Sequence, residues 1–446
     1  MADLKTNMCG IESPNPFWLA SAPPTNCGEQ IMRAFDAGWG GAVWKTLGKP
    51  IVNVSSRFGA LDHRGTKVVG FTNIELITDR PLATNFKEIE AVKKRYPEHA
   101  VIVSLMVETR EEWREIIARS EDAGADGIEL NFGCPHGMCE RGMGSSVGQE
   151  PAVLKEITSW AKEFAKVPVL VKLTPNVGDI LPPGLAAVAG GGDGISLINT
   201  VKSIIGVDLD CLNILPRVGE ASSNGGYCGP AVKPIALHMV AALARDRRID
   251  IPISGIGGIA NWRDAAEFIA LGSTTVQVCT AVMRDGYRIV EDMIDGLSAY
   301  LDAQGFGSVR QLIGRAVPGF LDWGDLDLNY KVVAQIDPGT CIGCQLCYIA
   351  CLDGAHQCIH TAKGPCSGYH GPPDHGQNPR LEVVPPLQHK AKPGVPDHVP
   401  QVDEDECIGC NLCQLVCPVP DCITMVEVPS GNGKESWNDR VAAGKA

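Results

Sequence analysis

"GIELNFGCPHGMCERGMG", residues 127–144, reads as a buried strand that runs into a glycine-rich loop carrying Cys134. Seven other short β-rich runs resemble its first part: "FWLASAP", "GAVWKTL", "VIVSLMV", "VPVLVKLTP", "GISLINTV", "IPISGIGG" and "TTVQVCTA". Segments of helical period lie between the runs, such as residues 110–125 and 151–166. Eight strand and helix alternations from residue 17 to about 303 predict an α/β fold, a (β/α)8 TIM barrel. A doubly wound open sheet is the alternative.

Length and charge limit what the chain can be. With 446 residues it is long enough for two domains. Its net charge of -13 disfavours nucleic acid as a partner, because phosphate binding needs clustered Lys and Arg. We find no export signal and no apolar stretch of about 20 residues, so we expect a cytoplasmic protein that does not bind a membrane.

The cysteines are concentrated in one part of the chain. Of the 18, eleven lie between residues 341 and 422. We do not expect a disulfide framework, because the cytosol keeps thiols reduced. Two C-x2-C-x2-C-x3-C motifs account for eight of them: Cys341, Cys344, Cys347 and Cys351, then Cys407, Cys410, Cys413 and Cys417. The repeated spacing predicts a ferredoxin-like domain with two 4Fe-4S clusters.

In two-cluster ferredoxins the fourth cysteine of each motif ligates the other cluster. The expected ligand sets are therefore Cys341, Cys344 and Cys347 with Cys417, and Cys407, Cys410 and Cys413 with Cys351. Structural zinc, which also takes four thiolates, is the competing interpretation. Cys358, Cys366 and Cys422 lie outside the motifs, and we interpret them as packing residues or unligated thiols.

These patterns predict four parts of the chain. Residues 1–305 form the barrel, residues 306–335 a connector, and residues 336–429 the ferredoxin-like domain. An insertion at about 352–406, rich in Pro, Gly and His, separates the two cysteine motifs. Residues 430–446 are a C-terminal tail.

Polar and glycine residues collect where the predicted strands end. In a barrel these ends converge on one face, which carries the active site. Glycines near residues 229, 257 and 258 predict a phosphate site in the last third of the barrel. The predicted cofactor-binding residues are Ala20, Ser21, Lys45, Thr46, Asn131, Lys172, Asn199, Gly229, Gly257, Gly258, Gln277, Cys279 and Thr280.

A phosphate-binding barrel joined to iron-sulfur clusters indicates flavin chemistry. The clusters pass single electrons, a carbon-carbon double bond takes up a hydride and a proton, and a flavin connects the two. Flavin mononucleotide (FMN) carries one phosphate and fits such a barrel. We expect Lys172 to lie near the flavin ring and stabilise its reduced form.

Cys134 is the candidate acid of this site. A thiol with an ordinary pKa near about 8.5 can exchange a proton around neutrality. Cys139, in the same loop, is the rival, and Cys134 is preferred because it lies nearer the strand end.

The motifs "NPFWLASAPPT", "AGWGGAVWKT", "NIELITD", "ELNFGCPHGMCERGMG", "VKLTPN" and "INTV", followed by two ferredoxin motifs, resemble the pyrimidine-reducing half of dihydropyrimidine dehydrogenase. They are most similar to the catalytic subunit of the bacterial NAD-dependent enzyme. The resemblance covers about 400 residues of the chain. It implies an oxidoreductase acting on CH–CH bonds, which reversibly reduces uracil or thymine to the 5,6-dihydro form.

The resemblance also implies roles for individual residues. FMN would deliver hydride to carbon 6 of the pyrimidine while Cys134 protonates carbon 5. Asn73, Asn131, Asn199 and Thr200 would bind the pyrimidine edges, with Glu75 and His136 as helpers.

The chain lacks a G-x-G-x-x-G motif at a strand-to-helix turn, so we expect NAD(H) and FAD to be bound by a partner subunit. This flavoprotein, in a hetero-oligomer such as a heterotetramer, would dock on the ferredoxin region and the insertion. Dihydroorotate dehydrogenase, with the same barrel and flavin, is the alternative enzyme. An electron-transfer subunit without its own catalysis is the alternative class.

Overall fold

The computed structural model describes residues 2–135, 143–361 and 398–445. The chain divides into two compact units, Met1–Phe320 and Leu321–Ala446. Among the described residues, no helix is long and apolar enough to cross a membrane.

A closed barrel of eight parallel strands forms the first unit, which confirms the predicted fold and excludes the open sheet. All eight runs identified in the sequence are its strands: β3 (Phe17–Leu19), β4 (Gly41–Leu47), β7 (Ala100–Leu105), β8 (Gly127–Asn131), β9 (Val169–Lys172), β10 (Gly194–Leu197), β15 (Ile253–Ile256) and β16 (Ser273–Val278). Each pairs with its neighbour in chain order, and β16 closes the ring on β3.

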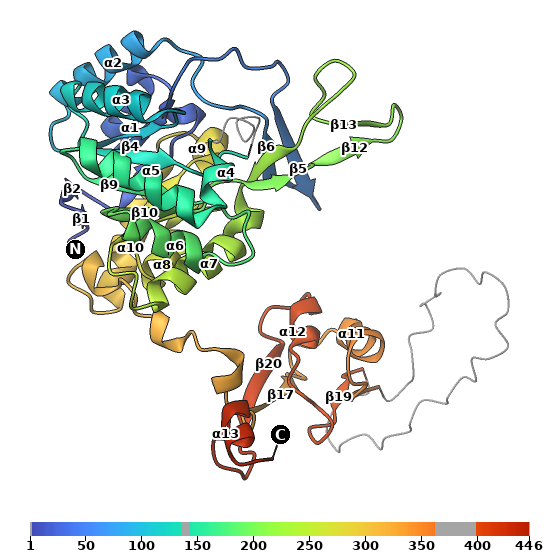
Figure 1. Cartoon of the computed structure of the whole chain (residues 1–446). Helices are drawn as coiled ribbons and strands as arrows, with labels where there is room; N and C mark the ends of the chain where they lie inside the picture. Colours follow the sequence, from blue (N-terminus) through green and yellow to red (C-terminus); the bar gives the residue numbers. More distant parts are fainter. Residues whose placement is uncertain (1, 136–142, 362–397, 446) are drawn as a thin grey trace. The chain divides into compact units, whose positions relative to one another are not determined.

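Eight helices follow these strands in turn and ring the barrel (Figure 1). They are α1 (Gly28–Ala37), α2 (Leu82–Arg95), α3 (Arg110–Asp122), α5 (Pro151–Phe164), α6 (Leu181–Ala189), α7 (Lys233–Arg245), α8 (Trp262–Ala270) and α10 (Ile289–Ala303). The shorter α4 (Ser145–Gly148) and α9 (Thr280–Asp285) follow β8 and β16. Apolar side chains such as Trp113, Leu154 and Phe268 fill the space between helices and strands, which is the burial that drives folding.

An antiparallel sheet that the sequence analysis missed grows from the loops at the carboxyl ends of β4 and β10. Its strand order is β11-β14-β6-β5, with β5 (Phe58–His63), β6 (Thr66–Asn73), β11 (Val201–Ser203) and β14 (Gly225–Cys228). A hairpin of β12 (Gly206–Asp208) and β13 (Asn213–Leu215) extends beside it, and Figure 1 shows these strands projecting from one side of the barrel.

The opposite end of the barrel is covered by the hairpin of β1 (Thr6–Met8) and β2 (Ile11–Ser13). Met8 and Ile11 pack there against Trp18, Ile102 and Leu170, all buried.

The first unit continues past residue 305, where the sequence placed the end of the barrel. Val309 and Leu312 are buried in the barrel's core, and the backbone N–H of Val309 donates to the carbonyl of Asp3 at 2.9 Å. Residues 306–320 are therefore part of the first unit, because they bury apolar side chains against it.

The second unit is built on two antiparallel strand pairs. β17 (Lys331–Ile336) pairs with β20 (Ile423–Val428), and β18 (Ile359–His360) pairs with β19 (Gln401–Val402). Its helices are α11 (Leu346–Gly354), α12 (Leu412–Val416) and α13 (Trp437–Ala442). β17 begins within the predicted connector, so the secondary structure of this unit starts before residue 336. Most of the predicted insertion, residues 362–397, lies outside the described residues.

Candidate active site and cluster cavities

A deep cavity lies at the carboxyl ends of the barrel strands, under the antiparallel sheet. It encloses about 1200 Å³ of empty space, part of it open to solvent, which is ample for a cofactor and a small substrate together. The sequence-predicted residues that line it are Ala20, Ser21, Lys45, Thr46, Asn73, Glu75, Asn131, Cys134, Lys172, Asn199, Thr200, Gly229, Gly257, Gly258, Gln277, Cys279 and Thr280. His136 lies outside the described residues, as does Cys139.

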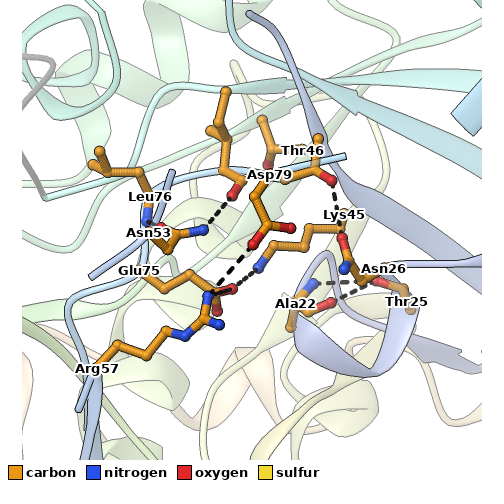
Figure 2. Close-up of polar contacts among 12 residues, drawn as sticks. Ala22, Thr25, Asn26, Lys45, Thr46, Asn53, Arg57, Glu75, Leu76 and Asp79 are labelled. Atoms are coloured by element: carbon orange, nitrogen blue, oxygen red, sulfur yellow. Dashed lines mark hydrogen bonds and ion pairs between the residues drawn. The ribbon is translucent and has the colours of Figure 1, made fainter. Parts of the chain in front are cut away.

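Lys45 forms a buried ion pair with Glu75 at one side of the cavity. The Lys45 Nζ to Glu75 Oε1 distance is 2.9 Å, and both side chains are at most one-tenth exposed. Arg57 donates to the same carboxylate oxygen at 3.2 Å, and Figure 2 shows Glu75 held between the two cations. Asn53 fixes the following backbone by accepting from the Leu76 N–H and donating to the Ile77 carbonyl. These contacts hold the Glu75 carboxylate at the cavity wall.

A second buried ion pair lies inside the barrel. The Lys172 Nζ is 3.4 Å from Oε1 of Glu129, whose side chain is fully buried. The other carboxylate oxygen of Glu129 accepts from Ser196 at 2.8 Å and from Gln277 at 3.2 Å. Glu129 on β8 is opposite Leu170 on β9, and Lys172 is opposite Asn131, two residues further along both strands. Alternate residues of a barrel strand point inward, so the Glu129 and Lys172 side chains can meet inside the barrel.

Side-chain amides form a connected row at the ends of β8 and β10. The Asn199 side-chain amide donates to the side-chain Oδ1 of Asn131 at 2.9 Å, and the Asn131 side-chain amide donates to the Thr46 hydroxyl at 2.9 Å. The Thr200 backbone N–H donates to Asn199 at 2.8 Å. On the sheet above, Asn73 donates to the carbonyl of Gly226 at 3.3 Å. The row fixes which way each amide faces, and amides present both donors and acceptors.

Cys134 lies three residues beyond the end of β8, and a backbone hydrogen bond ties it to the start of α4. Its backbone carbonyl accepts from the Ser145 N–H at 3.1 Å, at the start of α4. The side chain is buried and packs with Ile77, Met106 and Met143, and it also lines the cavity. The strand end and α4 together hold the thiol at the cavity wall.

The far end of the cavity is shaped to receive a phosphate-bearing flavin. Gly258 has a φ of 73°, and a Cβ at this position would lie only 2.9 Å from the Gly229 carbonyl oxygen, so the position requires glycine. With no side chain at Gly258 or Gly229, their backbone lines the cavity. Among the described residues, the buried Gln277 Oε1 has no hydrogen-bond partner. A flavin ring offers an N–H donor to such an oxygen, and the glycine loops offer backbone donors to a phosphate. The residues present therefore fit FMN.

Two further thiols line the cavity and are kept protonated by burial. Burial raises the pKa of Cys279 to about 12 and that of Cys228 to about 11. Thr280 donates its hydroxyl hydrogen to the Cys228 sulfur at 3.2 Å. Because these two thiols are neutral, they add no charge to the cavity, and its described charged groups are those of the ion pairs.

Sequence reasoning missed several residues of this site. Arg57, Phe58, Phe71 and Tyr227 come from the antiparallel sheet or the loop before it. The alternating run "TKVVGFTN" after the turn at Arg64 and Gly65, both of positive φ, was a detectable hairpin signal.

The motif cysteines of the second unit surround two small cavities. One is lined by Cys351, Cys407, Cys410 and Cys413, and the other by Cys341, Cys344, Cys347 and Cys417. This is the crossed grouping expected from the sequence. Four sulfurs facing one space is the donor set that a 4Fe-4S cluster takes, so both cavities fit one.

Comparison with known proteins places both units. The dihydroorotate dehydrogenase family matches residues 3–301, and a 4Fe-4S binding domain matches residues 400–420. The subunit PreA of NAD-dependent dihydropyrimidine dehydrogenase from Escherichia coli K12 is 46% identical over 363 residues, which are 81% of this chain and 88% of that protein.

Two other relatives are named for activities that differ from each other. The chloroplastic dihydropyrimidine dehydrogenase (NADP(+)) of Arabidopsis thaliana is 42% identical over 75% of this chain and 81% of its own length. The catalytic subunit of dihydroorotate dehydrogenase B (NAD(+)) from Pyrococcus horikoshii is 37% identical over 70% of this chain and 98% of its own length. The chain therefore belongs to the dihydroorotate dehydrogenase family, as an oxidoreductase that joins an FMN-binding barrel to a 4Fe-4S binding domain.

Proposed function

We propose that the chain reduces the 5,6 double bond of uracil or thymine to the dihydropyrimidine, in a reversible reaction. The observation that carries this proposal is the placement of Cys134, Lys172 and the amide row around one cavity. The higher identity to two dihydropyrimidine dehydrogenases than to the dihydroorotate enzyme supports it.

A pyrimidine ring suits the polar groups of the cavity. Its alternating N–H and C=O groups can pair with Asn73, Asn131 and Asn199, whose amides carry both donors and acceptors. The Glu75 carboxylate can accept from a ring N–H. A substrate of this kind is neutral.

The charges of the cavity favour a neutral ring over one that carries a carboxylate. Each described Lys or Arg that lines it already has an acidic partner: Lys45 with Glu75, Lys172 with Glu129, and Arg284 with Asp285. A substrate carboxylate would compete with these partners or stay unpaired, at a cost in binding energy. The paired charges therefore favour a neutral pyrimidine over the carboxylate-bearing substrate of a dihydroorotate dehydrogenase.

The chain's own residues would handle the proton and the orientation of the ring. When bound, FMN supplies the hydride for carbon 6. The Cys134 thiol gives a proton to carbon 5 and takes it back in the reverse direction. The amide row holds the ring so that carbon 5 faces the thiol, and the cation of Lys172 stabilises negative charge on its cavity side.

We further propose that the clusters receive single electrons from a partner flavoprotein that carries FAD and oxidises NAD(P)H. NAD(P)H gives up a hydride, which clusters cannot accept, so a flavin must stand between them. The partner and this chain would form a hetero-oligomer in the cytoplasm, where thiols stay reduced.

An anaerobic spectroscopic experiment tests the substrate. The purified full chain is loaded with FMN and clusters, reduced with dithionite, and mixed with uracil, thymine or orotate. We expect rapid flavin reoxidation with uracil or thymine and none with orotate. Reoxidation by orotate alone would assign the chain to the other activity of its family. No reoxidation by any of them would point to an electron-transfer subunit without catalysis.

A further inference from the structure

Each cluster cavity is lined by a fifth cysteine that no ligand set uses. Cys358 lines the cavity of Cys351, Cys407, Cys410 and Cys413, and Cys422 lines the other. Both side chains are buried. The two extra thiols differ in what they face, and this difference indicates a role for one of them.

Cys358 faces the cluster ligands. Its sulfur lies 3.6 Å from the sulfur of Cys351, and its thiol also contacts the side chain of Cys407. It thus lies beside two members of one ligand set. Cys422, in contrast, directs its thiol at the carbonyl oxygen of Asp337, at 3.9 Å.

The backbone holds Cys358 in this position. Its carbonyl accepts from the Asp403 N–H at 2.8 Å, next to the pairing of β18 with β19. The preceding Gln357 N–H donates to the Cys351 carbonyl at 3.2 Å, at the end of α11. Cys358 is therefore tied both to α11, which carries Cys351, and to the strand pair that leads to Cys407. Its thiol is positioned by secondary structure.

The stoichiometry of a cluster leaves Cys358 with its proton. A 4Fe-4S cluster takes four thiolates, and the crossed motifs already provide four at this cavity. A fifth, protonated thiol beside a coordinating sulfur can donate an S–H···S hydrogen bond. Hydrogen bonds to the sulfurs withdraw charge from the cluster, favour its more negative reduced form, and raise its reduction potential.

We propose that Cys358 is a tuning residue of this cluster, whose thiol donates a hydrogen bond to the Cys351 sulfur and raises the cluster's reduction potential. This inference rests on the cluster-binding part of the proposed function and not on the pyrimidine substrate. It replaces the interpretation of Cys358 as a packing or unligated thiol with no role. Cys422 has no such role, because its thiol faces a peptide carbonyl.

The test compares the full chain with Cys358→Ala, Cys358→Ser and, as the matched control, Cys422→Ala. Iron and sulfide content establish cluster occupancy, and a redox titration followed by electron paramagnetic resonance gives the potential of each cluster. A Cys410→Ser variant identifies which signal belongs to this cavity. We expect full occupancy in all three test variants and a lower potential for this cluster in Cys358→Ala. Cys358→Ser, which keeps a donor, should lie between Cys358→Ala and the unchanged chain.

A second readout detects the hydrogen itself. Transfer to D2O should remove a proton coupling from the reduced cluster of the unchanged chain and of Cys422→Ala, but not of Cys358→Ala. An unchanged potential in Cys358→Ala would overturn the proposal. Loss of the cluster in that variant would also overturn it, because it would make Cys358 a ligand. All these measurements are made without pyrimidine, so they stay decisive even if uracil is not the substrate.

Discussion

Glu129 shows how a single buried residue can set the charge of the site. Its carboxylate is fully buried, forms an ion pair with Lys172, and accepts hydrogen bonds from Ser196 and Gln277. A buried ion pair is expensive to break, because the remaining charge stays desolvated and unpaired. Glu129 thereby limits how much positive charge Lys172 presents to the cavity.

Replacing Glu129 by Gln should raise the reduction potential of the bound flavin. The variant keeps the shape and the hydrogen bonds but leaves the Lys172 cation uncompensated, which favours the reduced, more negative flavin. The folded state should lose roughly 3–5 kcal/mol. A spectroscopic redox titration measures the potential, with Ser196→Ala as the control that changes no charge. Equal flavin potentials in Glu129→Gln and the unchanged chain would show that Lys172 does not act on the flavin.

Replacing Cys134 by Ala should slow pyrimidine turnover by roughly 100- to 10,000-fold, because only the proton transfer is lost. The flavin and the clusters should stay bound, as absorbance and iron content would report. Cys139→Ala is the matched control in the same loop and should have a mild effect. Slow turnover in Cys139→Ala with normal turnover in Cys134→Ala would assign the acid to Cys139.

At the scale of elements, the sequence predicts a strand or helix well when the local residue pattern determines it. It fails for strands that form only by pairing with a segment far away in the sequence. The eight barrel strands each have an apolar run of their own, so all were found. β6 and β14 pair Asn73 with Gly226, which are 153 residues apart in the sequence. Neither strand's own residues predict which strand it pairs with. Arg57 was missed for this reason, since its loop is placed by that sheet. Glu129 was missed because it lies inside an apolar run and only the closed barrel turns it inward.

The ends of β14 and β16 should make the barrel sensitive to alkaline pH. Cys228 and Cys279 have pKa values raised by burial to about 11 and about 12 in the folded chain. An unfolded thiol loses its proton near pH 9, so between about pH 9 and 11 unfolding releases protons and becomes easier as the pH rises. Below pH 9 both thiols are protonated in the folded and the unfolded chain, so they do not lower the free energy of unfolding. Each thiol should cost about 1.4 kcal/mol per pH unit in that window.

Thermal melting of the full chain between pH 8 and 10.5 measures this effect. Cys228→Ala should weaken the pH dependence by about one thiol's share, while Cys211→Ala, at an exposed cysteine, should leave it unchanged. A pH dependence that is the same in all three proteins would refute the assignment to buried thiols.

At the scale of the whole molecule, the proposed function divides the chemistry between the two units, with pyrimidine reduction in the barrel and single-electron transfer in the cluster-binding unit. The sequence predicted the barrel from its strand and helix alternation and the second unit from its cysteine spacing, but it placed the end of the first unit at residue 305 instead of Phe320. The residues in between have no strand or long helical pattern. They belong to the barrel because Val309 and Leu312 are buried there, and burial of this kind shows only in the folded structure.

This division of labour predicts that the isolated chain cannot use NADH. Hydride transfer from NADH needs a nicotinamide site beside a hydride acceptor, and the sequence has no G-x-G-x-x-G turn of the kind that forms a dinucleotide site. Anaerobic mixing of the full chain, loaded with FMN and clusters, with NADH and uracil should therefore give no NADH oxidation. Reduced methyl viologen, a one-electron donor, should support uracil reduction by the same preparation. Addition of an FAD-containing NADH-oxidising partner should restore NADH-dependent turnover, whereas efficient NADH oxidation by the chain alone would show that it has a nicotinamide site of its own.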